Sequence, residues 1–261
     1  MQGDKMRVAV MGMGRLGRSL VQMLSPHPGF EVVGWRRKEP IPTDIDVYWI
    51  CVSDQSIACV AGQIPSGSIV LHASGALDVS VLRPHRPAGS LHPLQSFPGP
   101  EIAIPAPGDT PAAASGDPEA VEAAQRISSA LGFRAFEMTG DRRAYHAAAV
   151  IAGNFATLLL DQASELLVDA GVDLSNAPKV LAPLAIASIQ QATTSRPLEA
   201  LTGPVARGDT QTIGTHLDYL REKQPEIFEM YRLLTRILAE RLRKENRLET
   251  EDLDELIRLL G

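Results

Sequence analysis

Residues 8–21 have the sequence VAVMGMGRLGRSLV, in which three glycines join an apolar run to a helical pattern. A Gly-x-Gly-x-x-Gly spacing between a strand and a helix is typical of a turn that binds the pyrophosphate of a dinucleotide. Gly12 permits the tight turn, Gly14 lets the backbone approach the phosphates, and Gly17 lets the helix pack close to the strand. The N–H groups and positive end of the helix favour the same anion. Unless this is only a glycine-rich turn without a ligand, we expect a dinucleotide to contact Gly12, Met13, Gly14, Arg15, Leu16 and Gly17.

The first half of the chain alternates short apolar runs with helical patterns, which indicates a parallel sheet with crossover helices. The predicted strands are Met6–Met11, Phe30–Trp35, Val47–Val52, Ile69–Ala73, Gly89–His92 and Phe133–Met138. The predicted helices are Leu16–Leu24, Gln55–Gln63 and Pro118–Leu131. Pro98–Gly116 is rich in Pro, Ala and Gly, so we expect a loop with at most one edge strand at Glu101–Ile104. The predicted fold class is α/β, with a doubly wound parallel sheet of the Rossmann type.

The second half of the chain has only helical patterns. The predicted helices are Asp141–Ala170, Leu174–Thr194, Asp209–Leu220, Pro225–Glu245 and Thr250–Leu260. We therefore predict two domains, a dinucleotide-binding domain at residues 1–140 and an all-helical domain at residues 141–261.

The second predicted strand ends in the sequence GWRRK at residues 34–38. Rossmann domains that prefer NAD usually place Asp or Glu here, where the acid holds the ribose 2′-hydroxyl. Guanidinium groups instead bind phosphate through paired hydrogen bonds. We therefore predict NADP, with its 2′-phosphate on Arg36 and Arg37 and its adenine stacked on Trp35 or Arg36. The alternative is a solvated basic run.

The composition limits the classes of partner. Among 261 residues, 25 Lys and Arg stand against 31 Asp and Glu, which gives a net charge of −6 and argues against nucleic acid or an anionic membrane as partner. Cys51 and Cys59 lie in apolar surroundings and are expected to be buried, reduced thiols, without a metal site. We see no signal peptide and no apolar run of the ~20 residues that span a bilayer, so we expect a cytoplasmic protein.

Several short motifs together resemble one superfamily. The motifs are Gly12–Gly17, Ile50–Asp54, Leu71–Gly75, Ser90–Leu94, Tyr145–Asn154 and Leu201–Asp209. The chain resembles the dehydrogenases that include pyrroline-5-carboxylate reductase, ketopantoate reductase, prephenate dehydrogenase and the F420-dependent NADP oxidoreductases, and more narrowly an uncharacterised bacterial family among them. The resemblance implies a helical C-terminal domain similar to that of 6-phosphogluconate dehydrogenase. It also implies a homodimer formed through that domain, and an active site between the two domains for a small-molecule substrate.

Polar residues lie at the ends of three predicted strands, in the segments 52–54, 72–75 and 92–95. Ligands of such sheets lie at the carboxyl ends of the strands. Val52 and Ser53 are expected to flank the cofactor, as the matching segment does in similar enzymes. In prephenate dehydrogenases a similar His-Pro carries a catalytic histidine that a serine assists. By that resemblance His92 is a general acid or base and Ser74 contacts the same substrate oxygen. The alternative is a structural His-Pro turn.

A second set of polar residues lies on the helical half. His146 and Asn154 are eight residues apart and share one face of a helix. Similar enzymes place a lysine and an asparagine on this helix, but Arg142 and His146 stand here without a matching lysine. Asn154 lies in an apolar run, where an unpaired amide is costly, so it needs a ligand or a buried partner. Arg207 is a candidate for binding a substrate carboxylate, or is a surface arginine.

The leading hypothesis is an NADP-dependent oxidoreductase that acts on a small oxo, imino or hydroxy compound, one that carries a carboxylate. The alternatives are a non-catalytic NADP-binding regulator and an F420-dependent NADP reductase.

Overall fold

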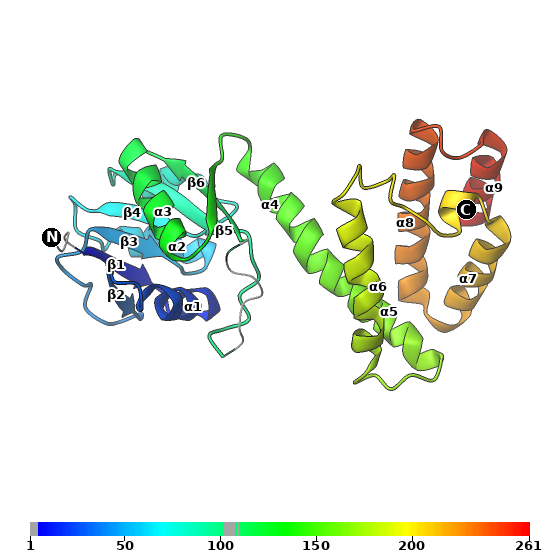
Figure 1. Ribbon diagram of the computed structural model, residues 1–261, viewed down its shortest axis with the longest axis horizontal. Helices are drawn as coiled ribbons and strands as arrows, with labels where there is room; N and C mark the ends of the chain where they lie inside the picture. The colour runs from blue at the N-terminus through cyan, green and yellow to red at the C-terminus, as the bar shows by residue number, and fades with distance from the viewer. Residues whose placement is uncertain (1–4, 102–107, 109) are drawn as a thin grey trace. The chain divides into compact units, whose positions relative to one another are not determined.

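The computed structural model describes residues 5–101, 108 and 110–261 (Figure 1). Its contacts define two compact units, Met1–Phe155 and Ala156–Gly261. The division falls inside the long helical stretch that follows Gly140, and the boundary at residue 140 stays a prediction. Most of the expected edge strand at Glu101–Ile104 lies outside the described residues.

The first unit contains a seven-stranded sheet in the order β2-β1-β3-β4-β5-β6-β7. Its strands are β1 (Met6–Met11), β2 (Phe30–Trp35), β3 (Val47–Ile50), β4 (Ile69–His72), β5 (Ala88–Pro93), β6 (Pro111–Gly116) and β7 (Arg134–Glu137). The first five strands in sheet order, from β2 to β5, are parallel, β6 is antiparallel to β5, and β7 is parallel to β6. The predicted α/β fold with a doubly wound sheet is confirmed. The carboxyl ends of β1, β3, β4 and β5 meet at one edge, which positions the candidate site.

Strand β6 corrects the sequence interpretation, because it lies in the stretch that was expected to be a loop. Ala112, Ala113 and Ala114 are buried. Their registered partners are neighbouring residues of β5, such as Leu91 opposite Ala114. Alanine side chains are too small to give the alternation of large apolar and polar residues by which a strand is predicted.

Both faces of the sheet are covered. Val8 and Val10 pack with α1 (Arg15–Leu24) and α3 (Pro118–Ala130). Ala9 and Met11 pack with α2 (Asp54–Ala61) and η1 (Val79–Leu82) on the opposite face. Successive residues of a strand point to opposite faces, so a sheet that is covered on both sides needs continuous apolar runs such as β1.

The two cysteines differ in exposure. Cys51 is buried at the end of β3, and burial raises the pKa of its thiol. Cys59 is exposed, which corrects the expectation that it is buried. It lies on α2, where Ile57, Val60 and Ala61 are the residues that face the core.

Helices make up the rest of the chain, as predicted. Helix α4 (Arg142–Val150) is followed by a π-helical turn, η3 (Ile151–Phe155), which interrupts the single helix expected at Asp141–Ala170. The second unit contains α5 (Ala156–Asp169), α6 (Ala177–Ala192), η4 (Val205–Arg207), α7 (Thr210–Lys223), α8 (Pro225–Lys244) and α9 (Thr250–Leu260). Helix α5 packs against α6, while α7, α8 and α9 share a core around Ile213, Leu242 and Leu256. Among the described helices, none is long and apolar enough to cross a membrane.

Candidate active site

The glycine turn after β1 has the backbone that its sequence predicts. Gly12 has a φ of 122°, and a Cβ there would lie 2.8 Å from the carbonyl oxygen of Cys51. A Cβ at Gly17 would lie 1.9 Å from the carbonyl oxygen of Gly12. Alanine fits at neither position without backbone movement, because Gly12 needs a left-handed conformation and Gly17 lets α1 contact the turn directly.

The N-terminus of α1 fits a dinucleotide pyrophosphate. Gly14 is the N-cap of α1, and no described side chain caps its backbone N–H groups. A Cβ built on Gly14 meets no described heavy atom within 4 Å, so the space beside this backbone is open. The first turn of α1 carries no acidic residue. Unpaired N–H groups at the positive end of a helix are a binding site for phosphate.

The end of β2 presents a basic turn. Arg36 and Arg37 are exposed. Glu39 is the acidic residue nearest to the two arginines in the sequence. Its carboxylate accepts a hydrogen bond from the Arg36 backbone N–H at 2.7 Å and so binds within the turn. Trp35 is 4% exposed, and its indole N–H donates to the Glu39 carbonyl. The tryptophan ring therefore packs into the core, and of the two residues expected to stack on adenine only Arg36 is exposed.

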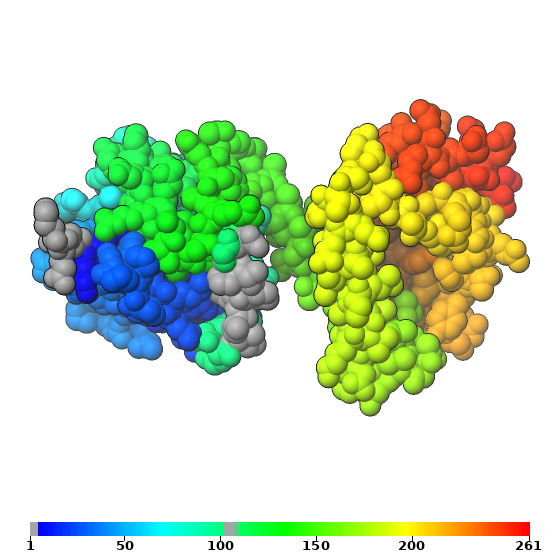
Figure 2. All heavy atoms as spheres, in the orientation of Figure 1, coloured from blue at the N-terminus to red at the C-terminus, as the bar shows by residue number. Residues whose placement is uncertain are grey.

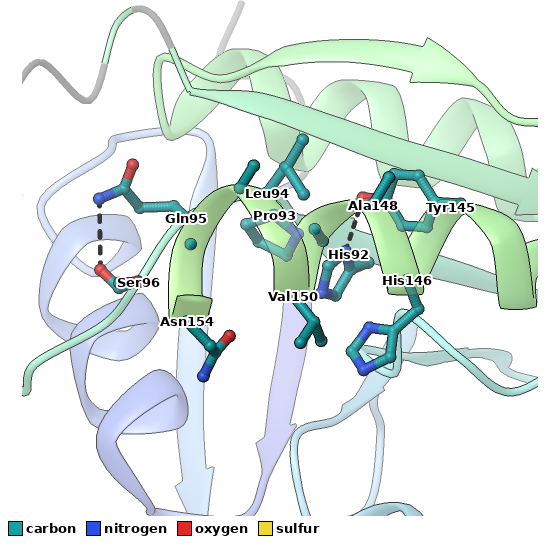
Figure 3. Close-up of a pocket in the computed structure, with 13 residues that line it drawn as sticks. His92, Pro93, Leu94, Gln95, Ser96, Tyr145, His146, Ala148, Val150 and Asn154 are labelled. Carbon is teal, nitrogen blue, oxygen red and sulfur yellow. Dashed lines mark hydrogen bonds between the residues drawn. The ribbon is translucent and has the colours of Figure 1, made fainter. Parts of the chain in front are cut away.

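A pocket of about 610 Å³ lies where the end of β5 meets α4 and η3 (Figure 3). The β5 side contributes His92 and the segment that follows it to Ser96. The helical side contributes residues from Tyr145 to Asn154. All of these residues belong to the first compact unit.

His92 is the central polar group of this pocket. Its Nδ1 lies 2.7 Å from the hydroxyl of Tyr145, and the two rings meet edge to face with centroids 5.5 Å apart. Burial, followed by the charges of His146 and Arg142, lowers the pKa of His92 to about 4. The imidazole is therefore neutral near pH 7 in the ligand-free protein.

The structure brings His146 and Asn154 into the same pocket. Both project from the side of the helical stretch that carries Val150, as the eight-residue spacing predicts (Figure 3). Asn154 is exposed, so its amide needs no buried partner, contrary to the expectation from its apolar neighbours. It lies in the π-helical turn η3, and such turns frequently occur at functional sites.

Arg142 points into the sheet. It is 7% exposed and donates hydrogen bonds to the hydroxyl oxygens of Ser90 and Ser115, at 2.8 and 2.9 Å. It also donates to the carbonyl oxygen of Ser74 at 2.7 Å. Arg142 thus ties β5, β6 and the turn after β4 to the first turn of α4. It is not among the residues that line the pocket.

The remaining candidate residues have varied surroundings. Ser74 is buried, and its hydroxyl oxygen accepts from the N–H groups of Ala76 and Leu77, so it shapes a turn and does not line the pocket. Val52 is half-buried, and Ser53 is the exposed N-cap of α2. Arg207 belongs to the second unit, where its exposed guanidinium lies 3.9 Å from Asp209.

Comparison with known proteins supports this architecture. Residues 110–237 match the family described as "Domain of unknown function (DUF2520)", which confirms the expected resemblance to an uncharacterised family. A search of curated proteins found no match. Among solved structures, the chain is similar to a candidate NADP oxidoreductase from Bacteroides fragilis, with 22% identity over 90% of this chain and 98% of that chain and a TM-score of 0.76.

Two further solved structures share the fold. One is 1-pyrroline-5-carboxylate reductase from Streptococcus pyogenes, with 12% identity over 93% of this chain and 100% of that chain and a TM-score of 0.64. The other is a reductive aminase from Aspergillus terreus in complex with NADPH and ethyl-5-oxohexanoate. It shows 18% identity over 93% of this chain and 95% of that chain, with a TM-score of 0.63. These likenesses confirm a Rossmann domain followed by helices.

Proposed function

We propose that the protein is an NADP-dependent oxidoreductase that transfers hydride between NADP(H) and a small oxo, imino or hydroxy compound bearing a carboxylate. The observation that carries this proposal is the uncapped N-terminus of α1, with open space at Gly14, at the sheet edge where β5 also places His92. Proteins of this fold include a candidate NADP oxidoreductase and an NADPH-bound reductive aminase, which supports the same assignment.

The chain's own groups would have distinct tasks. NADP(H), when bound, supplies or accepts the hydride. The turn at residues 12–17 holds the pyrophosphate, Arg36 and Arg37 hold the 2′-phosphate, and Val52 and Ser53 flank the cofactor. His92 exchanges a proton with the substrate. His146 and Asn154 contact the substrate from the helical side of the pocket. Arg207 is proposed to bind the carboxylate of the substrate.

The first test is nucleotide choice. We expect NADPH to bind more tightly than NADH, and the double variant Arg36→Ala/Arg37→Ala to weaken NADPH binding about 10²- to 10⁴-fold with little change for NADH. Hydrogen bonds to charged groups contribute ~1.5–3 kcal/mol each, and 1.4 kcal/mol corresponds to a factor of ten. Fluorescence titration with each nucleotide measures both constants.

Arg241→Ala/Arg243→Ala is the matched control, because it removes two exposed arginines from α8 and changes the net charge equally. NADH binding as tight as NADPH binding by the unsubstituted protein would rule out the NADP assignment. Equal weakening by both double variants would show a general charge effect.

We also propose a homodimer formed through the helical domain. Helix α6 exposes Val180, Leu184, Ile186 and Ile189, each more than half accessible to solvent. Figure 2 shows α6 in yellow-green at the surface of its unit. Exposed apolar area of this kind marks protein interfaces.

Sedimentation velocity tests the dimer. We expect the unsubstituted protein to sediment as a dimer and Leu184→Glu/Ile189→Glu as a monomer with unchanged helical circular dichroism, because two buried carboxylates without partners oppose association. Gln190→Glu/Gln191→Glu adds the same charge at exposed polar positions of the same helix and should remain dimeric. A monomeric unsubstituted protein would disprove the proposal.

A further inference from the structure

The contact between His92 and Tyr145 carries information on the substrate. A neutral imidazole has a proton on one ring nitrogen, and the hydrogen bond at one nitrogen decides which nitrogen that is. Nδ1 of His92 is 2.7 Å from the Tyr145 hydroxyl. The direction of this hydrogen bond therefore determines what the other nitrogen, Nε2, offers to a ligand.

The chemistry of the two groups sets that direction. Burial raises the pKa of Tyr145 above its ordinary value, despite the opposing charge of Arg142, so the phenol keeps its proton. A phenol O–H is a better donor than an imidazole N–H, and an imidazole nitrogen is a better acceptor than a phenol oxygen. Tyr145 thus donates to Nδ1, and the proton of His92 lies on Nε2.

Nε2 of His92 packs beside Gly75, whose missing side chain lets the ring approach the backbone. A Cβ at Gly75 would be 2.9 Å from Nε2 of His92 and 2.8 Å from Nδ1 of His146. The two ring nitrogens therefore lie close to the same backbone position. Nδ1 of His146 is buried and has no hydrogen-bond partner within the described chain, so a polar ligand atom that reaches the two histidines from the pocket they line would satisfy it.

The charges around the pocket favour a neutral or anionic ligand over a cationic one. The charges of His146 and Arg142 act on His92 more strongly than the opposing charge of Asp54. Among the described residues that line it, none is Asp or Glu. The buried guanidinium of Arg142 bonds only to neutral oxygens, those of Ser90, Ser115 and Ser74, and ion-pairs with no described carboxylate. A cationic ligand such as an iminium or an ammonium group is disfavoured beside a buried guanidinium, whereas a neutral or anionic ligand is not.

We propose that Tyr145 is a positioning residue that places the proton of His92 on Nε2, and that the substrate is an oxo compound held through its carbonyl oxygen. This inference rests on the proposed oxidoreductase function and selects one class among its oxo, imino and hydroxy substrates.

Each proton that moves in the reaction has a donor and an acceptor among these groups, the substrate and water. When hydride adds to the carbonyl carbon, the π electrons of the C–O bond move to oxygen, which takes the proton from Nε2. Nδ1 takes the proton of Tyr145 in the same transfer, so the imidazole stays neutral. The phenolate beside Arg142 then recovers a proton from water. In the reverse direction, the same groups remove the proton of a hydroxy compound.

Nitrogen NMR of the ¹⁵N-histidine-labelled protein tests the tautomer without a substrate. The chain has 6 histidines, and His92→Gln assigns the resonance. We expect an unprotonated Nδ1 and a protonated Nε2 in His92, and a mixture of tautomers in Tyr145→Phe. Tyr231→Phe is the matched control, because Tyr231 contacts Nδ1 of His216 at 2.9 Å and its loss should leave His92 unchanged. A protonated Nδ1 in the unsubstituted protein, or an unchanged His92 in Tyr145→Phe, overturns the positioning role.

Two small probes test the substrate class on the same resonance. With NADP⁺ present, we expect oxamate, which presents a carbonyl oxygen beside a carboxylate, to shift Nε2 of His92, and pyrrolidinium to leave it in place. A shift with pyrrolidinium alone, or none with oxamate, overturns the carbonyl assignment. Failure of the proposed function is distinguishable, because it appears as absent NADPH binding in the fluorescence titration, whereas the tautomer is measured without nucleotide.

Discussion

Replacing Gly14 with alanine is expected to weaken NADPH binding about 10- to 100-fold and to change the free energy of unfolding by no more than about 1 kcal/mol. The N-cap residue has φ −73° and ψ −166°, which alanine adopts without strain, and its Cβ would meet no described atom within 4 Å. A glycine replaced at such a position adds ~0.4–1 kcal/mol of stability through the unfolded chain, and the poorer N-cap preference of alanine offsets this gain. The added methyl group enters the space that the pyrophosphate would occupy, so only nucleotide binding suffers.

Gly17→Ala gives the opposite pattern and serves as the paired variant. Helix propensity favours alanine by about 1 kcal/mol. The added Cβ at position 17 would however lie 1.9 Å from the backbone carbonyl oxygen of Gly12. A backbone atom cannot move aside as easily as the end of a flexible side chain. We expect the clash to dominate, with a loss of roughly 1–3 kcal/mol in the free energy of unfolding.

Urea denaturation and NADPH titration of both variants separate the two effects. Unchanged NADPH affinity in Gly14→Ala would show that phosphate does not approach this backbone. A Gly17→Ala protein as stable as the original would show that α1 can shift on the turn.

Strong periodicity and special turn residues made most of the fold predictable. Strands β1 and β2 have the predicted bounds. Strand β1 ends in a continuous apolar run, as a parallel strand covered on both faces needs, whereas β2 lies at the sheet edge and exposes Glu31. Strand β6 was missed because its buried residues are alanines and its ends are Pro111 and Gly116. The strand forms because it pairs with β5, and this pairing cannot be predicted from the local sequence of β6 alone.

The candidate site was predictable where it depends on strand ends and helix periodicity. The sequence places His92 at the carboxyl end of a strand, and helical spacing places His146 and Asn154 on one face of a helix. The structure brings all three residues into the pocket. Tyr145 was not singled out, although it stands in the Tyr-His motif, because its role depends on a contact with a residue 53 positions away. Burial was equally hidden: local polarity does not show that Trp35 packs inward or that Asn154 is exposed.

Replacing His92 with alanine is expected to lower kcat/KM for NADPH-dependent reduction about 10²- to 10⁴-fold, the usual contribution of a positioned proton donor. NADPH affinity should not change, because the residues proposed to hold the nucleotide lie at other strand ends. The assay follows NADPH oxidation with pyruvate, 2-oxobutanoate and phenylpyruvate, and uses the 2-oxo acid that the unsubstituted protein reduces fastest. Undiminished turnover in His92→Ala would remove His92 from the mechanism.

Gly75→Ala tests the same site without removing either imidazole. The added Cβ would lie within 3 Å of ring nitrogens of both His92 and His146, and rings at the ends of side chains can move aside. The fold should therefore persist while the donor nitrogen leaves its place, and a displacement of about 1 Å costs roughly 10²-fold in rate. Gly140→Ala is the control, because a Cβ there meets no described atom within 4 Å. Full activity of Gly75→Ala would show that turnover does not need the two rings at the positions they hold beside Gly75.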